Sequence, residues 1–199
     1  MMKMKKFNDE VYYAEEKVVQ VSREVIDFLK QKALENPRKR CRLCTHRDVN
    51  DKIHEMIIVH TRDTYVRPHK HTGKVEAFHL IEGLVDVLLF DEQGKIKQVI
   101  QMGPYGSGKT FYYKIDQADY HTLLIKSDIV VFHEITTGPF RKEETIFAPW
   151  SPEDTDKKSV SEFMKKLSQQ DEEDTASLAM DSAKGSGKKK GQKAKKVTL

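Results

Sequence analysis

The chain has 199 residues, of which 38% are hydrophobic and 33% charged, with a formal net charge of +4. This length fits one domain with tails, and no apolar stretch approaches the roughly 20 residues of a membrane span. Residues 154–199 hold 11 Lys/Arg and 8 Asp/Glu, so this segment carries +3 of the net charge. The nearly neutral body gives no indication of specific nucleic-acid binding.

Residues 1–37 are predicted to form an N-terminal helical extension. Apolar residues recur at helical spacing from Val18 to Ala33, which predicts an amphipathic helix over residues 14–35 that ends near Pro37. We expect this helix to pack against a sheet or across a subunit boundary. The basic start of the chain lacks an apolar segment behind it, so we expect no signal peptide and a cytoplasmic location.

A basic segment follows, with five Lys/Arg among residues 38–47. Its Cys41 and Cys44 form a C-x-x-C pair, but a structural zinc site needs four ligands and no second pair is present. The basic side chains are either a solvated strand edge or the anion-binding rim of a cavity. In the second case Arg40 and Arg42 are candidates for binding a phosphate or carboxylate.

Short apolar segments dominate the central region, residues 38–153. They are rich in Val, Ile, Leu, Phe and Tyr, and turn residues such as Gly94 separate them. Many short strands without intervening helices predict an all-β antiparallel sandwich or barrel. The expected strands cover residues 54–62, 76–82, 84–90, 96–101, 110–115, 121–126 and 129–136.

A metal-ligand pattern lies within this region. His69 and His71 are two residues apart, so on an extended segment they point to the same face. A Thr-Gly-Lys turn allows Glu76 to return to that face, and His121 begins another apolar segment. Nitrogen and carboxylate ligands of this kind suit Fe, Mn, Ni or Zn as a divalent ion. The alternative interpretation is a solvated loop that binds no metal.

The whole pattern, H-x-H-x4-E-x6-G from His69 to Gly83, resembles the first motif of the cupin superfamily. Over residues 38–153 the chain is similar to the WbuC-type cupin-fold metalloproteins found among bacterial surface-polysaccharide genes. The segments that carry this resemblance are Tyr65–His71, Phe90–Gly94, Tyr120–Thr122, Glu134 with Gly138-Pro139, and Phe147–Pro152. The resemblance implies a cupin jelly-roll β-barrel with a cavity and a metal held by His69, His71, Glu76 and His121.

The same resemblance implies a function on a small polar molecule, such as a sugar or nucleotide sugar in surface-polysaccharide metabolism. Isomerase or epimerase chemistry is the expected reaction and dioxygenase chemistry the less favoured one. A non-catalytic binding or sensor protein is the alternative. We expect Glu134, Tyr65 and Lys70 as catalytic groups, Arg67 with the two candidate arginines as substrate-binding groups, and a homodimer without membrane or nucleic-acid partners.

Residues 154–199 are predicted to be a short helix followed by a Lys-rich flexible tail. Apolar residues between positions 159 and 169 indicate the helix, and the composition beyond Gln170 is too polar to bury a core. We expect the lysine-rich run at 188–196 to be solvated and free of a fixed structure.

Overall fold

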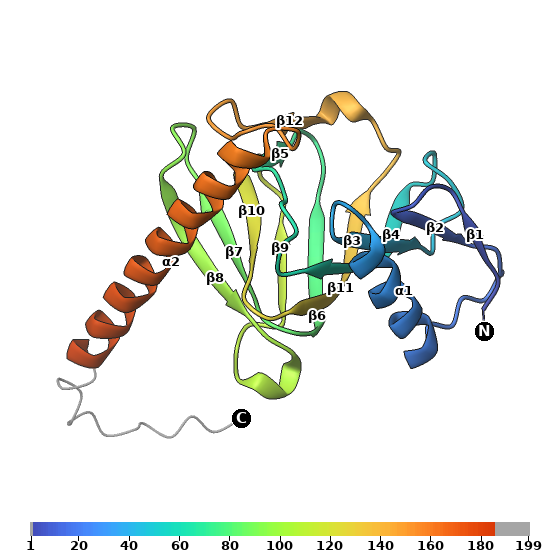
Figure 1. Ribbon diagram of the computed structural model, residues 1–199, viewed down its shortest axis with the longest axis horizontal. Helices are drawn as coiled ribbons and strands as arrows, with labels where there is room; N and C mark the ends of the chain where they lie inside the picture. Colours follow the sequence, from blue (N-terminus) through green and yellow to red (C-terminus); the bar gives the residue numbers. More distant parts are fainter. Residues whose placement is uncertain (1, 186–199) are drawn as a thin grey trace, which may run out of the picture.

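The computed structural model describes residues 2–185 and consists of two β-sheets and two α-helices (Figure 1). The larger sheet has the order β1 (Met4–Lys6), β2 (Val11–Ala14), β3 (Arg40–Cys44), β4 (Ile53–Thr61), β11 (Ile129–Thr137), β6 (Glu76–Glu82), β9 (Tyr112–Ile115). The smaller sheet has the order β12 (Thr145–Phe147), β5 (His69–His71), β10 (Tyr120–Ile125), β7 (Val85–Phe90), β8 (Ile96–Met102). The chain also contains two short 3-10 helices, η1 (Tyr105–Ser107) and η2 (Lys142–Glu144). Among the named strand pairs, only β2 and β3 run parallel.

The two sheets face each other across a shared apolar core. Alternate residues of each strand point inward, as in Met56 and Ile58 of β4 and Val85 and Val87 of β7. Phe132 of β11 stacks on Phe78 of β6 with their ring centroids 4.0 Å apart. Full burial of a side chain of this size contributes about 1.5–3 kcal/mol. This shared core fixes which face of each strand can line a cavity.

Helix α1 (Arg23–Glu35) covers the outer face of the larger sheet. Its buried residues Val25, Leu29 and Ala33 are four apart, so they form one stripe against apolar side chains of β3 and β4. The predicted helix is therefore present, but its predicted start at residue 14 is wrong by nine residues. The chain up to Ala14 instead forms the β1–β2 hairpin, because Val11 and its aromatic neighbours pair with β3.

Helix α2 (Lys157–Gly185) covers the outer face of the smaller sheet (Figure 1). Leu167 is buried there among apolar residues of β7 and β10. The predicted short helix exists, but it continues well past residue 169. Asp171 is only 1% exposed and accepts a hydrogen bond from Lys126 Nζ at 2.9 Å, which ties the second half of the helix to the sheet. The lysine-rich run at 188–196 lies outside the described residues.

The seven predicted strands are all present, each within two residues of its predicted ends. Sequence patterns did not predict the short strands β1, β2, β3, β5 and β12. The two sheets form a jelly-roll-like sandwich and, within residues 2–185, do not hydrogen-bond into the closed barrel that was expected. None of the helices described combines the length and the apolar character needed to cross a membrane.

Candidate metal centre

Three histidines meet on the inner face of the smaller sheet. His69 of β5 lies directly opposite His121 of β10, and His71 follows two residues along β5 on the same face. One ring nitrogen from each histidine lies within 4.8 Å of the nitrogens of the other two. The sequence pattern thus brings together three of the residues that it marked as metal ligands.

Contacts made by the chain itself orient the three rings. The Nδ1 atom of His69 lies 2.8 Å from the Arg67 carbonyl oxygen, and that of His121 lies 3.1 Å from the Asp119 carbonyl oxygen. A carbonyl oxygen can only accept, so both Nδ1 atoms donate, and in a neutral ring of this tautomer the Nε2 atom keeps its lone pair. His71 Nδ1 lies 3.2 Å from the Thr145 hydroxyl. This arrangement is typical of metal-binding histidines, whose second nitrogen is held by the protein.

Glu76 approaches the cluster from β6 of the larger sheet. Its carboxylate oxygens lie 3.3 Å from His71 Nε2 and 3.8 Å from His121 Nε2. Burial acts to raise the pKa of Glu76, but the hydrogen bond with His71 and the electrostatic interactions with His121, His69 and His71 outweigh it and lower the pKa to about 2. Glu76 is therefore an anion beside the three imidazoles.

The donor set fits a divalent cation. Burial, with the neighbouring His121 and His71, lowers the pKa of His69 to about 3, so its ring is neutral as a metal ligand must be. His121 Nε2 is buried and has no hydrogen-bond partner among residues 2–172. Three nitrogens with one carboxylate suit Fe, Mn, Ni or Zn.

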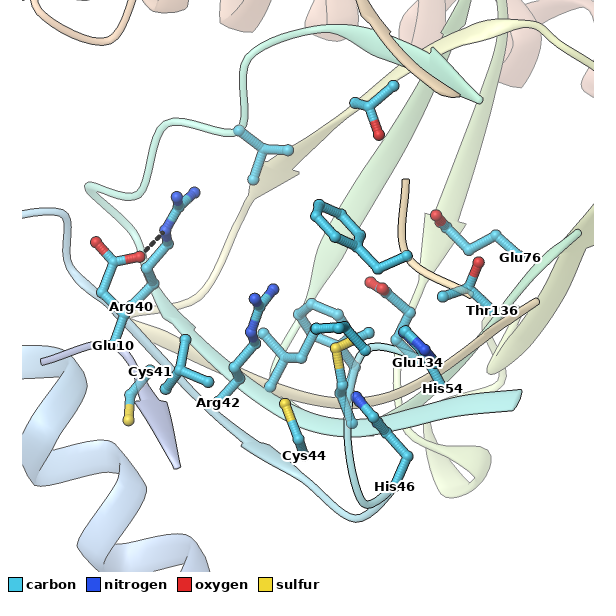
Figure 2. A pocket seen from close by; sticks show the side chains of 18 of the residues that line it. Glu10, Arg40, Cys41, Arg42, Cys44, His46, His54, Glu76, Glu134 and Thr136 are labelled. Atoms are coloured by element: carbon cyan, nitrogen blue, oxygen red, sulfur yellow. Dashed lines mark hydrogen bonds and ion pairs between the residues drawn. The ribbon is translucent and has the colours of Figure 1, made fainter. Parts of the chain in front are cut away.

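A cavity of about 870 Å³ is lined by the three histidines and by residues on the inner face of the larger sheet. Figure 2 shows the part of its wall that runs from Glu10 and Arg40 to Glu134 and Glu76. Glu134 of β11 lies in its wall. Burial and the charge of Glu76 raise the pKa of Glu134 to about 8, and the positive charge of Arg42 partly opposes this shift. The cavity therefore holds an ionised carboxylate and a protonated carboxyl group at neutral pH.

The remaining predicted site residues divide into two groups. Arg40 and Arg42 of β3 line the cavity. Tyr65, Arg67 and Lys70 are not among its lining residues and have partners elsewhere. Tyr65 donates a hydrogen bond to the Pro152 carbonyl oxygen, Arg67 contacts Ser151, and Lys70 pairs with Glu92. The structure does not bring these three to the site where catalytic or substrate-binding groups were expected.

The C-x-x-C pair forms no shared site. Cys41 packs in the core beneath α1, whereas Cys44 packs in the core between the sheets. Both are free cysteines, and burial raises the pKa of the Cys41 thiol to about 12. The two thiols therefore lie in different parts of the core.

Sequence reasoning did not assign a role to three further histidines in the cavity wall, His46, His54 and His60. His54 and His60 share the inner face of β4 with Met56 and Ile58, so the alternation of side chains along the strand could have predicted that both face the cavity. His46 stacks on His54 with ring centroids 4.1 Å apart. No local pattern could reveal that the β1–β2 segment also lines the cavity through Glu10 and Tyr13.

A model of the family described as a domain of unknown function, DUF6016, matches residues 21–102. No curated protein matches the chain. The similar solved structures include a Shewanella oneidensis protein, with 10% identity, coverage of 65% of this chain and 85% of that one, and a TM-score of 0.48. Oxalate decarboxylase from Bacillus subtilis has 14% identity, coverage of 50% and 25%, and a TM-score of 0.39. The Cnp3 cupin domain of Schizosaccharomyces pombe has 9% identity, coverage of 50% and 64%, and a TM-score of 0.39.

The chain spans 25% of the length of the oxalate decarboxylase chain and 64% of that of the Cnp3 cupin domain. The class is defined by the molecule itself. Two facing sheets with a histidine cluster on the inner face of one make it a jelly-roll-like β protein with a candidate metal site.

Proposed function

We propose that the chain is a cupin-type metalloprotein that acts on a small polar molecule. Its divalent ion would be held by the Nε2 atoms of His69, His71 and His121 and by an oxygen of Glu76. This proposal rests on the orientation of the three imidazole rings. The chain's own oxygen atoms hold the three Nδ1 atoms, and the carboxylate of Glu76 lies against two of the Nε2 atoms.

The cavity supports chemistry by proton transfer. When bound, the ion would polarise a carbonyl or hydroxyl oxygen of the substrate. Burial and the charge of Glu76 raise the pKa of Glu134 to about 8, which keeps its carboxyl group protonated at neutral pH. It would therefore donate a proton first and accept one later, as isomerisation or epimerisation requires.

The cavity volume of about 870 Å³ accommodates a sugar-sized molecule. The resemblance to WbuC-type proteins supports a sugar or nucleotide sugar as substrate, within surface-polysaccharide metabolism. We propose a homodimer as the assembly. A sensor that binds the same ligand without turnover is the alternative. Glu134→Gln separates the two, because it would slow turnover by about a hundredfold or more in an enzyme and would change only ligand affinity in a sensor.

The metal content of the purified full chain tests the proposal before any substrate is known. After chelation and reloading with Fe(II), Mn(II), Ni(II) or Zn(II), elemental analysis should find one tightly bound equivalent of at least one of these ions. His71→Ala and His121→Ala should lose it. His79→Ala is the matched control, since His79 is exposed on the outer face of β6 and should not affect the metal. Equal metal content in all four proteins, or none in the wild type, contradicts the proposal.

A further inference from the structure

The cavity has a second polar end, on β3 and β4, away from the histidine cluster. Strand alternation places Arg40 and Arg42 on the cavity side of β3. On the neighbouring strand β4, His60 lies directly opposite Arg40 in the register. Figure 2 shows the Arg42 side chain pointing into the space between Arg40 and Glu134. Two guanidinium groups and an imidazole thus share one part of the wall.

The charges at this end are only partly neutralised. Glu10, from the segment before β2, forms ion pairs with Arg40 at 2.9 Å and with Arg38 at 3.3 Å. Arg42 forms no ion pair with any carboxylate among residues 2–172, although it lines the same cavity. A guanidinium binds carboxylate and phosphate oxygens through its planar set of N–H donors. The Glu10 carboxylate is bound in this way, so this end of the cavity is suited to a carboxylate or phosphate group of a ligand.

His60 gives an independent indication that this end takes a ligand. Its side chain is part of the cavity wall, the residue is only 7% exposed, and its Nδ1 atom is buried without a hydrogen-bond partner among residues 2–172. Burial and the three nearby arginines lower its pKa to about 3, so the ring is neutral and has one N–H to donate. A buried polar group without a partner costs about 1–3 kcal/mol, and a rotation of the ring that brings this nitrogen to a ligand atom in the cavity would offset that cost.

We propose that Arg42 and His60 bind the oxyanion of a ligand, a carboxylate or a phosphate, and that the other end of this ligand lies at the histidine cluster. Arg40 remains paired with Glu10 and positions the wall beside them. The second half of the proposal rests on the proposed function. Strands β3 and β6 are three positions apart in the sheet, about 14 Å at the usual spacing, so the ligand is longer than a simple inorganic ion.

Calorimetric titration of the full chain with inorganic phosphate and with succinate tests this subsite. Arg42→Ala should weaken binding of the preferred anion at least about tenfold, the cost of losing one charged hydrogen-bonding partner. His60→Phe keeps a ring in the wall and should weaken binding severalfold. Arg62→Ala is the matched control, because Arg62 pairs with Asp128 and does not line the cavity. Thermal melting verifies that each variant is folded.

A preference for phosphate over succinate identifies a phosphoryl end, and the reverse identifies a carboxylate end. The proposal is overturned if the wild type binds neither anion, or if Arg42→Ala or His60→Phe binds as tightly as Arg62→Ala.

A variant with His69 and His71 both replaced by Ala separates the test of the metal site from the test of the anion subsite. It should lose the metal and retain phosphate or succinate affinity, because the arginine end makes its own contacts. If the wild type binds no metal but still binds the anion in a way that depends on Arg42, the proposed function is refuted and the anion subsite remains supported. If the double histidine variant loses anion affinity and Arg42→Ala keeps it, the proposed anion subsite is overturned.

Discussion

Glu134 and Glu76 face one cavity from adjacent strands, and opposite environments act on their two carboxyl groups. Thr136, two residues after Glu134 on β11, lies directly opposite Glu76 of β6. The histidines hold Glu76 ionised, whereas burial and the charge of Glu76 keep Glu134 protonated. Two nearby carboxyl groups whose pKa values are driven apart in this way are suited to separate roles, one as a fixed anion and one as a proton donor.

The raised pKa of Glu134 predicts how stability depends on pH. Its pKa increases from 4.5 to about 8 in the folded protein, so the folded state binds the proton more tightly than the unfolded state. Its contribution to stability is fully present below pH 4.5 and is lost as the pH rises to 8. In chelator-treated protein, Glu134→Gln should therefore be more stable than the wild type at pH 9 by about 2–4 kcal/mol, and similar at pH 4.

Urea unfolding at the two pH values measures this difference. Glu55→Gln is the control, because Glu55 is exposed on the outer face of β4, on the opposite side of the sheet from the cavity. A pH-independent effect of Glu134→Gln would show that the Glu134 carboxyl is ionised and solvated in the folded protein.

The second half of α2 is predicted to contribute to stability through Asp171. Asp171→Ala removes the buried partner of Lys126 and should lower the free energy of unfolding by about 1–2 kcal/mol, a loss limited because Asp86 lies 3.8 Å from the same Lys126 Nζ. Chemical denaturation should show this loss and little change in Glu172→Ala, whose side chain is exposed. Equal stability of the two variants would mean that residues beyond 170 do not dock on the sheet.

Helix α1 is predicted to be an integral part of the fold. Leu29 is fully buried beneath the sheet, so Leu29→Ala should cost about 2–5 kcal/mol of unfolding free energy. Leu34→Ala on the same helix removes an exposed side chain and should change stability by less than about 0.5 kcal/mol. A small effect of Leu29→Ala in denaturant titrations would indicate that α1 is only loosely attached.

The sequence predicted the strands that carry strong apolar patterns, and the H-x-H-x4-E spacing brought Glu76 beside the histidines. Strand alternation could also have excluded Lys70, which lies between His69 and His71 and so points to the opposite face. Tyr65 could not be placed in this way, because it lies in an irregular segment before β5.

Features that depend on contacts distant in the sequence were not predictable. The β1 and β2 strands are three and four residues long, and β2 is secured by parallel pairing with β3. The Asp171–Lys126 pair joins α2 to residues 45 positions away in the sequence, and no helix-local pattern reveals this contact. The arginine end of the cavity likewise exists only because β3 lies beside β4 in the larger sheet.

Anomalous X-ray diffraction from crystals of the metal-loaded full chain locates the ion that we propose. We expect one strong metal peak at about 2.0–2.3 Å from the Nε2 atoms of His69, His71 and His121 and from one oxygen of Glu76. A metal bound elsewhere, or bound through the Nδ1 atoms of these histidines, would contradict it.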